Sequence, residues 1–459
     1  MRLSDISKCV DILDLRNFDR KDPEFTRFHV NSKKVCEGTL FFAIKGKHHD
    51  GHSFLREAWE KGATAAVVEK FVKDVPIPQI LVRSTVETLG KLAKRKLEEC
   101  GDSVRICITG SNGKTTTKEL IHHHLSKIVG YPIFKNEGNM NTEIGLPLTI
   151  LNDYHGERIL VLELGINKPG DMDKLVKIIK PSIGIFLNLG SAHVGNFDSL
   201  EELFYEKAKL IFSLEPFSLA IINEDDIRIS NLKNIRRNLR YSGFGRKKGK
   251  VRLAGWSYEI ENGSFATRSI YFIDGKRTEI KLKNVWNEGQ LLDLSAVLCL
   301  IDSMGYEVKV ETFEDFELPD GRFKLSKVHD ILLIDDTYNS NVESVKKAVG
   351  TISNLPAKKR IAVIGAMKEL GKFSGWYHAE LGRLLGTFDI VFIYLKDPEI
   401  LMIRDELNGL NLREEKDPLK LAQDILSVVE KGDLIYFKAS RAIEIERVME
   451  EVWRNLSNF

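Results

Sequence analysis

The chain has 459 residues, of which 43% are hydrophobic and 29% charged, as in globular proteins large enough for about three domains. Its 68 Lys and Arg against 66 Asp and Glu leave a net charge of +2, which excludes a polybasic nucleic-acid-coating protein. Five cysteines without a CxxC pair argue against a disulfide framework or a structural zinc site and indicate a reducing compartment.

The first segment, residues 1–98, carries short strand-like runs such as TLFFAI (39–44) and TAAVVE (64–69) and ends in a charged helix. The N-terminus lacks the charged-then-apolar pattern of a signal peptide. The longest apolar runs, about eight residues, are far short of the ~20 needed to cross a bilayer. We therefore expect a soluble, cytoplasmic protein.

The second segment, residues 99–314, has the rhythm of a parallel sheet covered by helices on both faces. Apolar strand candidates alternate with helical patterns at 104–108, 159–165, 182–190 and 219–225. Residues 245–285 instead alternate apolar and polar residues around turns, which predicts an antiparallel β insertion.

The third segment, residues 315–459, repeats the α/β rhythm and is Rossmann-like in outline, without a GxGxxG motif. Its buried-strand candidates lie at 330–336, 360–367, 388–395 and 433–440. We predict an α/β protein of three domains: a small α/β domain, a central parallel-sheet domain and a Rossmann-like domain. Ligands of such open sheets bind beyond the carboxyl ends of strands, so residues that end apolar runs are the site candidates.

The strongest motif is TGSNGKTTT, residues 109–117, between a strand-like run and a helical pattern. Gly110 and Gly113 let the backbone curl around a polyphosphate, Lys114 supplies a charge for it, and the Thr115 hydroxyl can bind Mg²⁺. Ile108 stands where a general phosphate loop has its first glycine, which changes the spacing and not the chemistry. The motif predicts a nucleotide site. The predicted nucleotide-binding residues of the motif also include Ser111, Asn112 and Thr116.

Two polar residues end later strands of the same predicted sheet, Glu163 in LVLELG and His193 in NLGSAH. A carboxylate and a neutral imidazole beside a triphosphate suit a second divalent cation. The alternatives are that Glu163 is a capping carboxylate and that His193 is an ordinary polar loop histidine. NKPG at 167–170 lacks the aspartate of a guanine reader, which disfavours a switch GTPase.

Together, GSNGKTT, ELG, NLGSAH and the pair Ala208–Lys209 resemble the ATP-dependent Mur ligases of peptidoglycan synthesis. That family has a nucleotide-sugar domain, an ATPase domain and a Rossmann-like domain. The resemblance implies two Mg²⁺ ions, one on Thr115 and the second on Glu163, His193 and a carbamylated Lys209. The alternative for Lys209 is an ordinary solvated lysine, with Lys207 as a competing choice.

The stretches 31–54 and 136–151 resemble motifs of the family members that add D-alanyl-D-alanine. The resemblance places Ser32 and Lys33 against the uridine diphosphate portion. It assigns three asparagines to the substrate: Asn139, Asn141 and Asn167. Lys33 replaces the family's arginine, and lysine keeps the charge without bidentate phosphate recognition.

In the third segment, LPDGRFK (318–324) and IDDTYNSN resemble the family's C-terminal motifs. The resemblance implies nucleotide contacts by Arg322, by Asp336 at the ribose, and by Asn339 at the base or the acceptor. One family motif, GxHNxxN, is missing: residues 284–297 contain no histidine. Asn287 and Asp293 are the polar candidates there, and neither is assigned.

The resemblance implies an ATP-dependent ligase that joins D-alanyl-D-alanine to UDP-MurNAc-tripeptide through an acyl phosphate, the last cytoplasmic step towards the pentapeptide precursor. The alternatives are another Mur ligase or folylpolyglutamate synthetase and, farther off, a P-loop kinase or nucleotide-binding module. We expect ATP and Mg²⁺ as cofactors, a monomer, and no nucleic-acid or membrane partner. The third residue of the peptide is not indicated.

Overall fold

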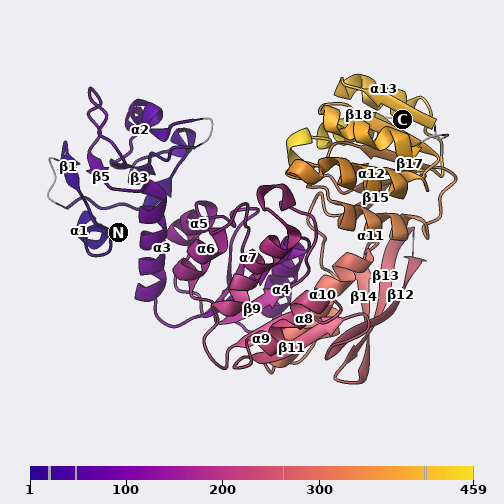
Figure 1. Cartoon of the computed structure of the whole chain (residues 1–459), viewed down its shortest axis with the longest axis horizontal. Coiled ribbons are helices and arrows are strands. Elements are labelled where there is room, and N and C mark those ends of the chain that lie inside the picture. Colours follow the sequence, from indigo (N-terminus) through magenta and orange to yellow (C-terminus); the bar gives the residue numbers. More distant parts are fainter. Residues whose placement is uncertain (19–21, 47–48, 262, 408, 410, 458–459) are drawn as a thin grey trace. The chain divides into compact units, whose positions relative to one another are not determined.

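The computed structural model describes residues 1–18, 22–46, 49–261, 263–407, 409 and 411–457 (Figure 1). Residues 47 and 48, in the motif at 31–54, lie outside the described residues. Two compact units make up the chain. The first comprises Met1–Ile106, Tyr131–Gly165 and Asp171–Ser182, and the second comprises Cys107–Gly130, Ile166–Gly170 and Ile183–Phe459.

The first unit begins with a five-stranded sheet in the order β1-β5-β4-β3-β2, in which only β1 is antiparallel to its neighbour. The strands are β1 Asp14–Arg16, β2 Arg27–His29, β3 Thr39–Phe42, β4 Ala65–Val68 and β5 Gln79–Leu81. Every residue of β3 and β4 is buried, which explains why these strands read as continuous apolar runs. Short helices join them: α1 Leu3–Ser7, η1 Ser32–Lys34, η2 Gly51–Phe54 and α2 Leu55–Glu60.

The remainder of the first unit is built on the long helix α3, Thr85–Glu99, which begins at Ser84 as its N-cap. It packs against α5, Gly145–Asp153, and α6, Asp171–Ile179. Asn152 at the end of α5 bonds both the N–H and the C=O of Phe28 in β2, at 3.0 and 2.9 Å. β7, Phe134–Lys135, pairs in parallel with β8, Ile159–Glu163.

The second unit contains a sheet whose strands run in the order β14-β13-β12-β11-β10-β9. These are β9 Ile183–Phe186, β10 Leu219–Asn223, β11 Arg240–Gly245, β12 Val251–Glu261, β13 Ser264–Ile273 and β14 Lys276–Lys283. β9 to β11 are parallel, and β12 to β14 form an antiparallel meander, so the predicted β insertion is confirmed. The helices are α4 Lys114–Ile128, α7 Leu200–Phe212, α8 Ile227–Ser230, α9 Leu232–Ile235 and α10 Glu288–Ser303, with the short η3 Val194–Asn196 and η4 Val310–Phe313.

The second unit also contains a six-stranded sheet in the order β15-β16-β20-β17-β18-β19, parallel except for β15. Its strands are β15 Lys324–Val328, β16 Ile331–Asp335, β17 Arg360–Ile364, β18 Ile390–Tyr394, β19 Asn411–Glu415 and β20 Leu434–Lys438. Its helices are α11 Val342–Ile352, η5 Gly371–Phe373, α12 Ser374–Leu385, η6 Pro398–Leu407, α13 Pro418–Leu426, η7 Arg441–Ile443 and α14 Glu446–Ser457. This is the Rossmann-like arrangement that the sequence predicts.

Three α/β sheet systems in chain order confirm the predicted fold class. The boundaries near residues 98 and 314 stay a prediction. Across the described residues, no helix is long and apolar enough to cross a membrane.

Candidate nucleotide-binding site

The phosphate loop lies between β6, Val104–Thr109, and the first residue of α4, Lys114. Gly113 is the N-cap of α4 and has a φ of +85°, in the left-handed region that favours glycine. A Cβ on Gly113 would lie 2.1 Å from Oδ1 of Asp293, so the space also excludes any side chain. The loop presents the N-terminus of a 15-residue helix, a suitable place for an anion.

The segment that follows β9 holds the loop in shape through paired hydrogen bonds. The Asn112 N–H donates to Oδ1 of Asn188 at 2.8 Å, and Nδ2 of Asn188 donates to the Asn112 C=O at 3.0 Å. The Ser111 hydroxyl donates to the Gly190 C=O at 3.0 Å and accepts from the Gly190 N–H at 2.8 Å. These four hydrogen bonds fix Ser111 and Asn112 against the segment that follows β9.

Two lysines converge on one carbonyl of the loop. Nζ of Lys114 donates to the Gly110 C=O at 2.8 Å, and Nζ of Lys207, on α7, approaches the same oxygen at 3.4 Å. Burial, aided by the nearby Lys114, holds the pKa of Lys207 well below its ordinary value. Lys209, which the resemblance favours, instead donates to Oε2 of Glu206 at 2.7 Å and is one-third exposed.

Arg322 lies between β14 and β15 and reaches the phosphate loop. Its Nη2 donates to Oγ1 of Thr115 at 3.0 Å, and its guanidinium carbon lies 3.6 Å from the ring centroid of Tyr338. Stacking on an aromatic face orients a guanidinium without using its N–H donors. Arg322 therefore has donors left for a ligand at the loop.

Asp293 is a buried ionisable group that lies against the phosphate loop. Its carboxyl, on α10, is buried beside Gly113. Burial raises its pKa to about 7, against the opposing effects of Lys347, Arg322 and Lys114. Asn287, the other candidate at the missing motif, caps α10 by accepting from the Gln290 N–H at 3.0 Å. Of the two, Asp293 is the one that lies against the phosphate loop.

Carboxylates from beyond residue 314 hold the loop that contains His193. Glu343, on α11, accepts from the Ser191 N–H at 3.0 Å and from its hydroxyl at 2.8 Å. His193 has a φ of +67°, and its Nδ1 lies 2.5 Å from Oε2 of Glu369. Sequence reasoning missed both glutamates; the only signal was their place in strings that resemble family motifs, NVES and KELG.

Asp336 and Asn339, which the resemblance assigns to the nucleotide, lie beyond the carboxyl end of β16. Oδ2 of Asp336 accepts from Nζ of Lys438 at 2.6 Å and from the Tyr436 hydroxyl at 3.0 Å. Burial raises the pKa of Asp336, and the Lys438 charge opposes that rise. Oδ1 of Asn339 accepts from the N–H of Ser340 at 2.9 Å. In this structure Asp336 is thus part of a buried ion pair.

Glu163 is buried at the end of β8, in the first unit. Nδ2 of Asn141 donates to its Oε1 at 2.5 Å, and the Glu163 N–H donates to Oδ1 of Asn136 at 3.0 Å. The structure thus brings together two predicted site residues, and Asn141 orients the carboxylate. Asn139 adds a backbone contact, since its C=O accepts from the Asn141 N–H at 2.8 Å. Asn167 is exposed and belongs to the second unit.

The predicted uridine-binding residues lie on η1. Ser32 is buried and donates to Oε2 of Glu57 at 2.7 Å, whereas the Lys33 side chain is exposed. Asn31, where the family has aspartate, caps η1 by accepting from the Lys33 N–H at 2.9 Å. The replacement therefore preserves the local turn.

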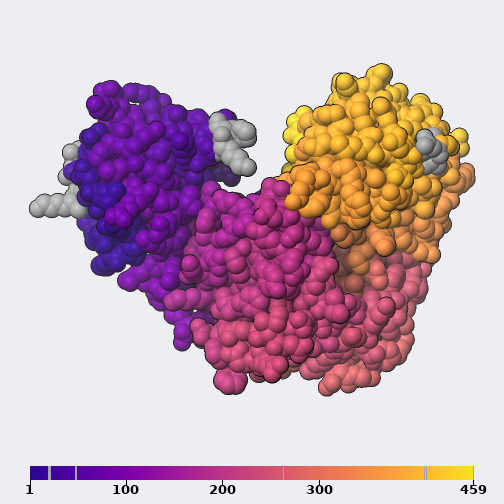
Figure 2. All heavy atoms as spheres, in the orientation of Figure 1, coloured from indigo at the N-terminus to yellow at the C-terminus, as the bar shows by residue number. Residues whose placement is uncertain are grey.

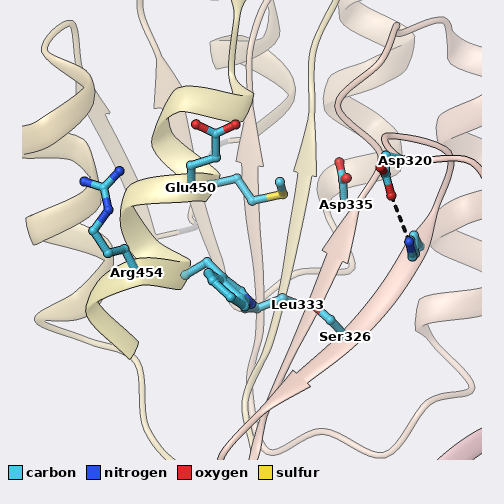
Figure 3. A pocket seen from close by; sticks show the side chains of 9 residues that line it. Asp320, Ser326, Leu333, Asp335, Glu450 and Arg454 are labelled. Carbon is cyan, nitrogen blue, oxygen red and sulfur yellow. Dashed lines mark hydrogen bonds and ion pairs between the residues drawn. The ribbon is translucent and has the colours of Figure 1, made fainter. Parts of the chain in front are cut away.

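A groove of about 560 Å³ lies between α14 and strands β15 and β16 (Figure 3). Its lining is acidic at several points: Asp320, Asp335 and Glu450 against Lys324 and Arg454. Lys324 is paired with Asp320 at 2.8 Å, and Oδ2 of Asp335 accepts from the Gly321 N–H at 2.9 Å. An excess of carboxylates disfavours a polyphosphate, so we place the nucleotide at the phosphate loop and not here.

A phosphate loop joined by an arginine of a Rossmann-like domain defines a nucleotide-dependent α/β enzyme. Three family models match in chain order: "Mur ligase family, catalytic domain" at residues 24–97, "Mur ligase middle domain" at 108–285 and "Mur ligase, glutamate ligase domain" at 321–441. The chain belongs to the Mur ligase family.

Relatives match over almost the whole chain. The UDP-N-acetylmuramoyl-tripeptide–D-alanyl-D-alanine ligase of Rickettsia prowazekii is 30% identical over 92% of this chain and 93% of its own. That of Bacillus subtilis is 30% identical over 92% of each. A MurF ligase from Thermotoga maritima, crystallised with ADP, is 39% identical with a TM-score of 0.85, covering 94% of this chain and 98% of that one.

Proposed function

We propose that this chain is an ATP-dependent ligase that joins D-alanyl-D-alanine to UDP-N-acetylmuramoyl-tripeptide in peptidoglycan synthesis. The observation that carries the proposal is the contact of Arg322 with Thr115 of the phosphate loop, which brings the C-terminal domain to the nucleotide site. Relatives whose names state this reaction support it, since each of the two covers 92% of the chain.

The chemistry requires activation because forming an amide from a carboxylate and an amine in water is uphill. A terminal carboxylate oxygen of the tripeptide attacks the γ-phosphorus of ATP, the bond to the β–γ bridging oxygen breaks, and ADP leaves. The amine of D-alanyl-D-alanine then attacks the acyl carbon, inorganic phosphate departs, and the amine loses a proton. The product is the pentapeptide precursor.

Positioning and charge neutralisation carry most of such a phosphoryl transfer. Lys114, which now donates to the Gly110 C=O, would turn to the β- and γ-phosphates, and the loop N–H groups would bind the same oxygens. Arg322 would contribute a second cation from its stacked position on Tyr338. These groups stabilise the charge that develops on the departing ADP.

The donor chemistry fits Mg²⁺ as a resident cofactor. The Thr115 hydroxyl would hold one ion; the Glu163 carboxylate, the His193 imidazole and a carbamate on Lys209 would hold the second. The hydrogen bond from Asn141 orients the Glu163 carboxylate, as the ligands of metal sites commonly require. Bound Mg²⁺ supplies charge neutralisation at the phosphates. A carbamate forms from a neutral amine, so Lys207 is the second candidate for that role.

We propose in addition that the enzyme acts as a monomer in the cytoplasm, where ATP is available, without nucleic-acid or membrane partners. Phosphate release from Mg·ATP with UDP-MurNAc-tripeptide, with and without D-alanyl-D-alanine, tests the reaction. Release that needs both substrates, with a product heavier by one dipeptide unit, supports it. Release with a single amino acid, or with glutamate and folate, would assign a sister ligase instead. ADP formation that needs no amine and releases no inorganic phosphate would indicate a kinase.

A further inference from the structure

Three asparagines form a chain of hydrogen bonds through the phosphate loop. Asn188 holds the Asn112 backbone, and the Asn112 side chain continues to Asn341 at the start of α11. Nδ2 of Asn341 donates to Oδ1 of Asn112 at 2.6 Å, and Nδ2 of Asn112 donates to Oδ1 of Asn341 at 3.2 Å. The two side-chain amides thus pair reciprocally, each as donor and acceptor.

Asn341 is only 4% exposed, so its amide is well shielded from water. Its Oδ1 also accepts from the Ser344 N–H at 2.9 Å, which caps α11. The capping bond fixes the Asn341 amide relative to α11. The reciprocal pair then fixes the Asn112 side chain relative to Asn341. The pair is partly buried, and a hydrogen bond shielded from water with both partners fixed is directional and costly to break.

We propose that Asn341 is a positioning residue for the phosphate loop: it holds the Asn112 side chain and makes the loop's shape depend on the C-terminal domain. The inference rests on the proposed function only in that ATP is the nucleotide concerned. An amide is required there, because a carboxylate at position 341 would set two acceptors against each other and place an anion beside the phosphates.

The cap and the pair are separable by substitution. Asn341→Ser and Asn341→Asp both keep a good N-cap for α11 but lose the reciprocal pair. Asn112→Ala removes the partner and leaves the backbone bonds to Asn188 in place. Asp417→Ala is the matched control, because it removes the N-cap of α13, which accepts from the Lys420 N–H at 2.8 Å.

The first measurement is the affinity of the full-length chain for ADP by isothermal titration calorimetry, together with the unfolding midpoint of each variant. We expect Asn341→Ser to weaken ADP binding about tenfold, the effect of losing two neutral hydrogen bonds, and Asn341→Asp to weaken it further. Asn112→Ala should weaken ADP binding by a similar factor. The double variant Asn112→Ala/Asn341→Ser should bind ADP as well as the single variant that has the lower affinity. Asp417→Ala should bind ADP like the wild type.

The second measurement is steady-state kinetics with UDP-MurNAc-tripeptide and D-alanyl-D-alanine. The KM for ATP should rise in Asn341→Ser while the KM for D-alanyl-D-alanine stays unchanged, a division that mere destabilisation would not produce. ADP affinity within twofold of wild type, or additive effects in the double variant, would overturn the inference. A wild type that binds ADP but does not form the amide would sink the proposed function alone. If Asn341→Ser unfolds, Asn112→Ala decides the question.

Discussion

The phosphate loop and the predicted uridine-binding residues on η1 are held in different ways. The loop is fixed by hydrogen bonds to Asn188 and Asn341 and by close packing against Asp293. On η1, Ser32 is tied to Glu57, but the Lys33 side chain is exposed (Figure 2 shows the surface of the molecule). The proposed phosphoryl-transfer groups are thus built into the core, whereas a proposed substrate-binding group stands in solvent. Changes at the loop should therefore affect stability and nucleotide binding together.

Gly113→Ala should have the largest effect. Its φ of +85° and the approach of Asp293 within 2.1 Å of a Cβ are both incompatible with a side chain. We expect the free energy of unfolding to fall by about 3 kcal/mol or more, by urea titration, and ADP binding to be lost in calorimetry. Gly101→Ala is the control, because Gly101 has nearly the same φ, +86°, with nothing within 4 Å. An equal loss in both variants would rule out the packing explanation.

Asp293→Asn should stabilise the chain at neutral pH. The folded carboxyl has a pKa of about 7, against 3.8 for an ordinary aspartate, so between these two pH values the folded state binds more protons than the unfolded state. Wild-type stability therefore falls as pH rises from about 4 to 7, and the variant lacks this loss. We expect an advantage of up to about 4 kcal/mol at pH 8 that vanishes near pH 4, from urea unfolding across pH. Parallel profiles would show that Asp293 ionises normally.

Lys207→Met tests a pH dependence of stability opposite in sign to that of Asp293, at a second buried group beside the phosphate loop. Because burial lowers the pKa of Lys207, the unfolded chain binds more protons than the folded chain between that lowered pKa and 10.5. Between pH 8 and 10, wild-type stability should rise more steeply with pH than that of the variant, which lacks the buried amine. Urea unfolding at these pH values measures the difference, with Lys209→Met as the partly exposed control. An unchanged slope in Lys207→Met would mean that Lys207 is charged in the fold.

Lys33→Ala should have the smallest effect on stability, under about 0.5 kcal/mol, because the side chain is exposed. The KM for UDP-MurNAc-tripeptide should rise about tenfold as a charge-assisted phosphate contact is lost. Lys33→Arg should lower that KM, since a guanidinium binds phosphate in bidentate fashion. Lys34→Ala, at the neighbouring exposed lysine, is the control. An equal rise in KM in that variant would mean that the effect comes from the loss of any positive charge in this region and not from a specific contact of Lys33.

The elements that could be predicted from sequence are those specified by local pattern. The phosphate loop is a contiguous string, and alternation at 245–285 predicted the meander of β12 to β14. Glu163 was singled out because a carboxylate closes an apolar run, and in the structure it is buried at the end of β8. Each of these signals is carried by residues close together in the chain.

The amino-acid sequence by itself determined the class of each domain and the nucleotide loop, because burial periodicity and turn chemistry are local. Tertiary structure alone decided which distant side chains complete the site: Asn112 and Asn341 are 229 residues apart. It also distinguished Lys207 from Lys209. Two residues apart on α7, these lysines lie on nearly opposite sides of the helix, and only the packing of α7 determined which amine was buried against the loop.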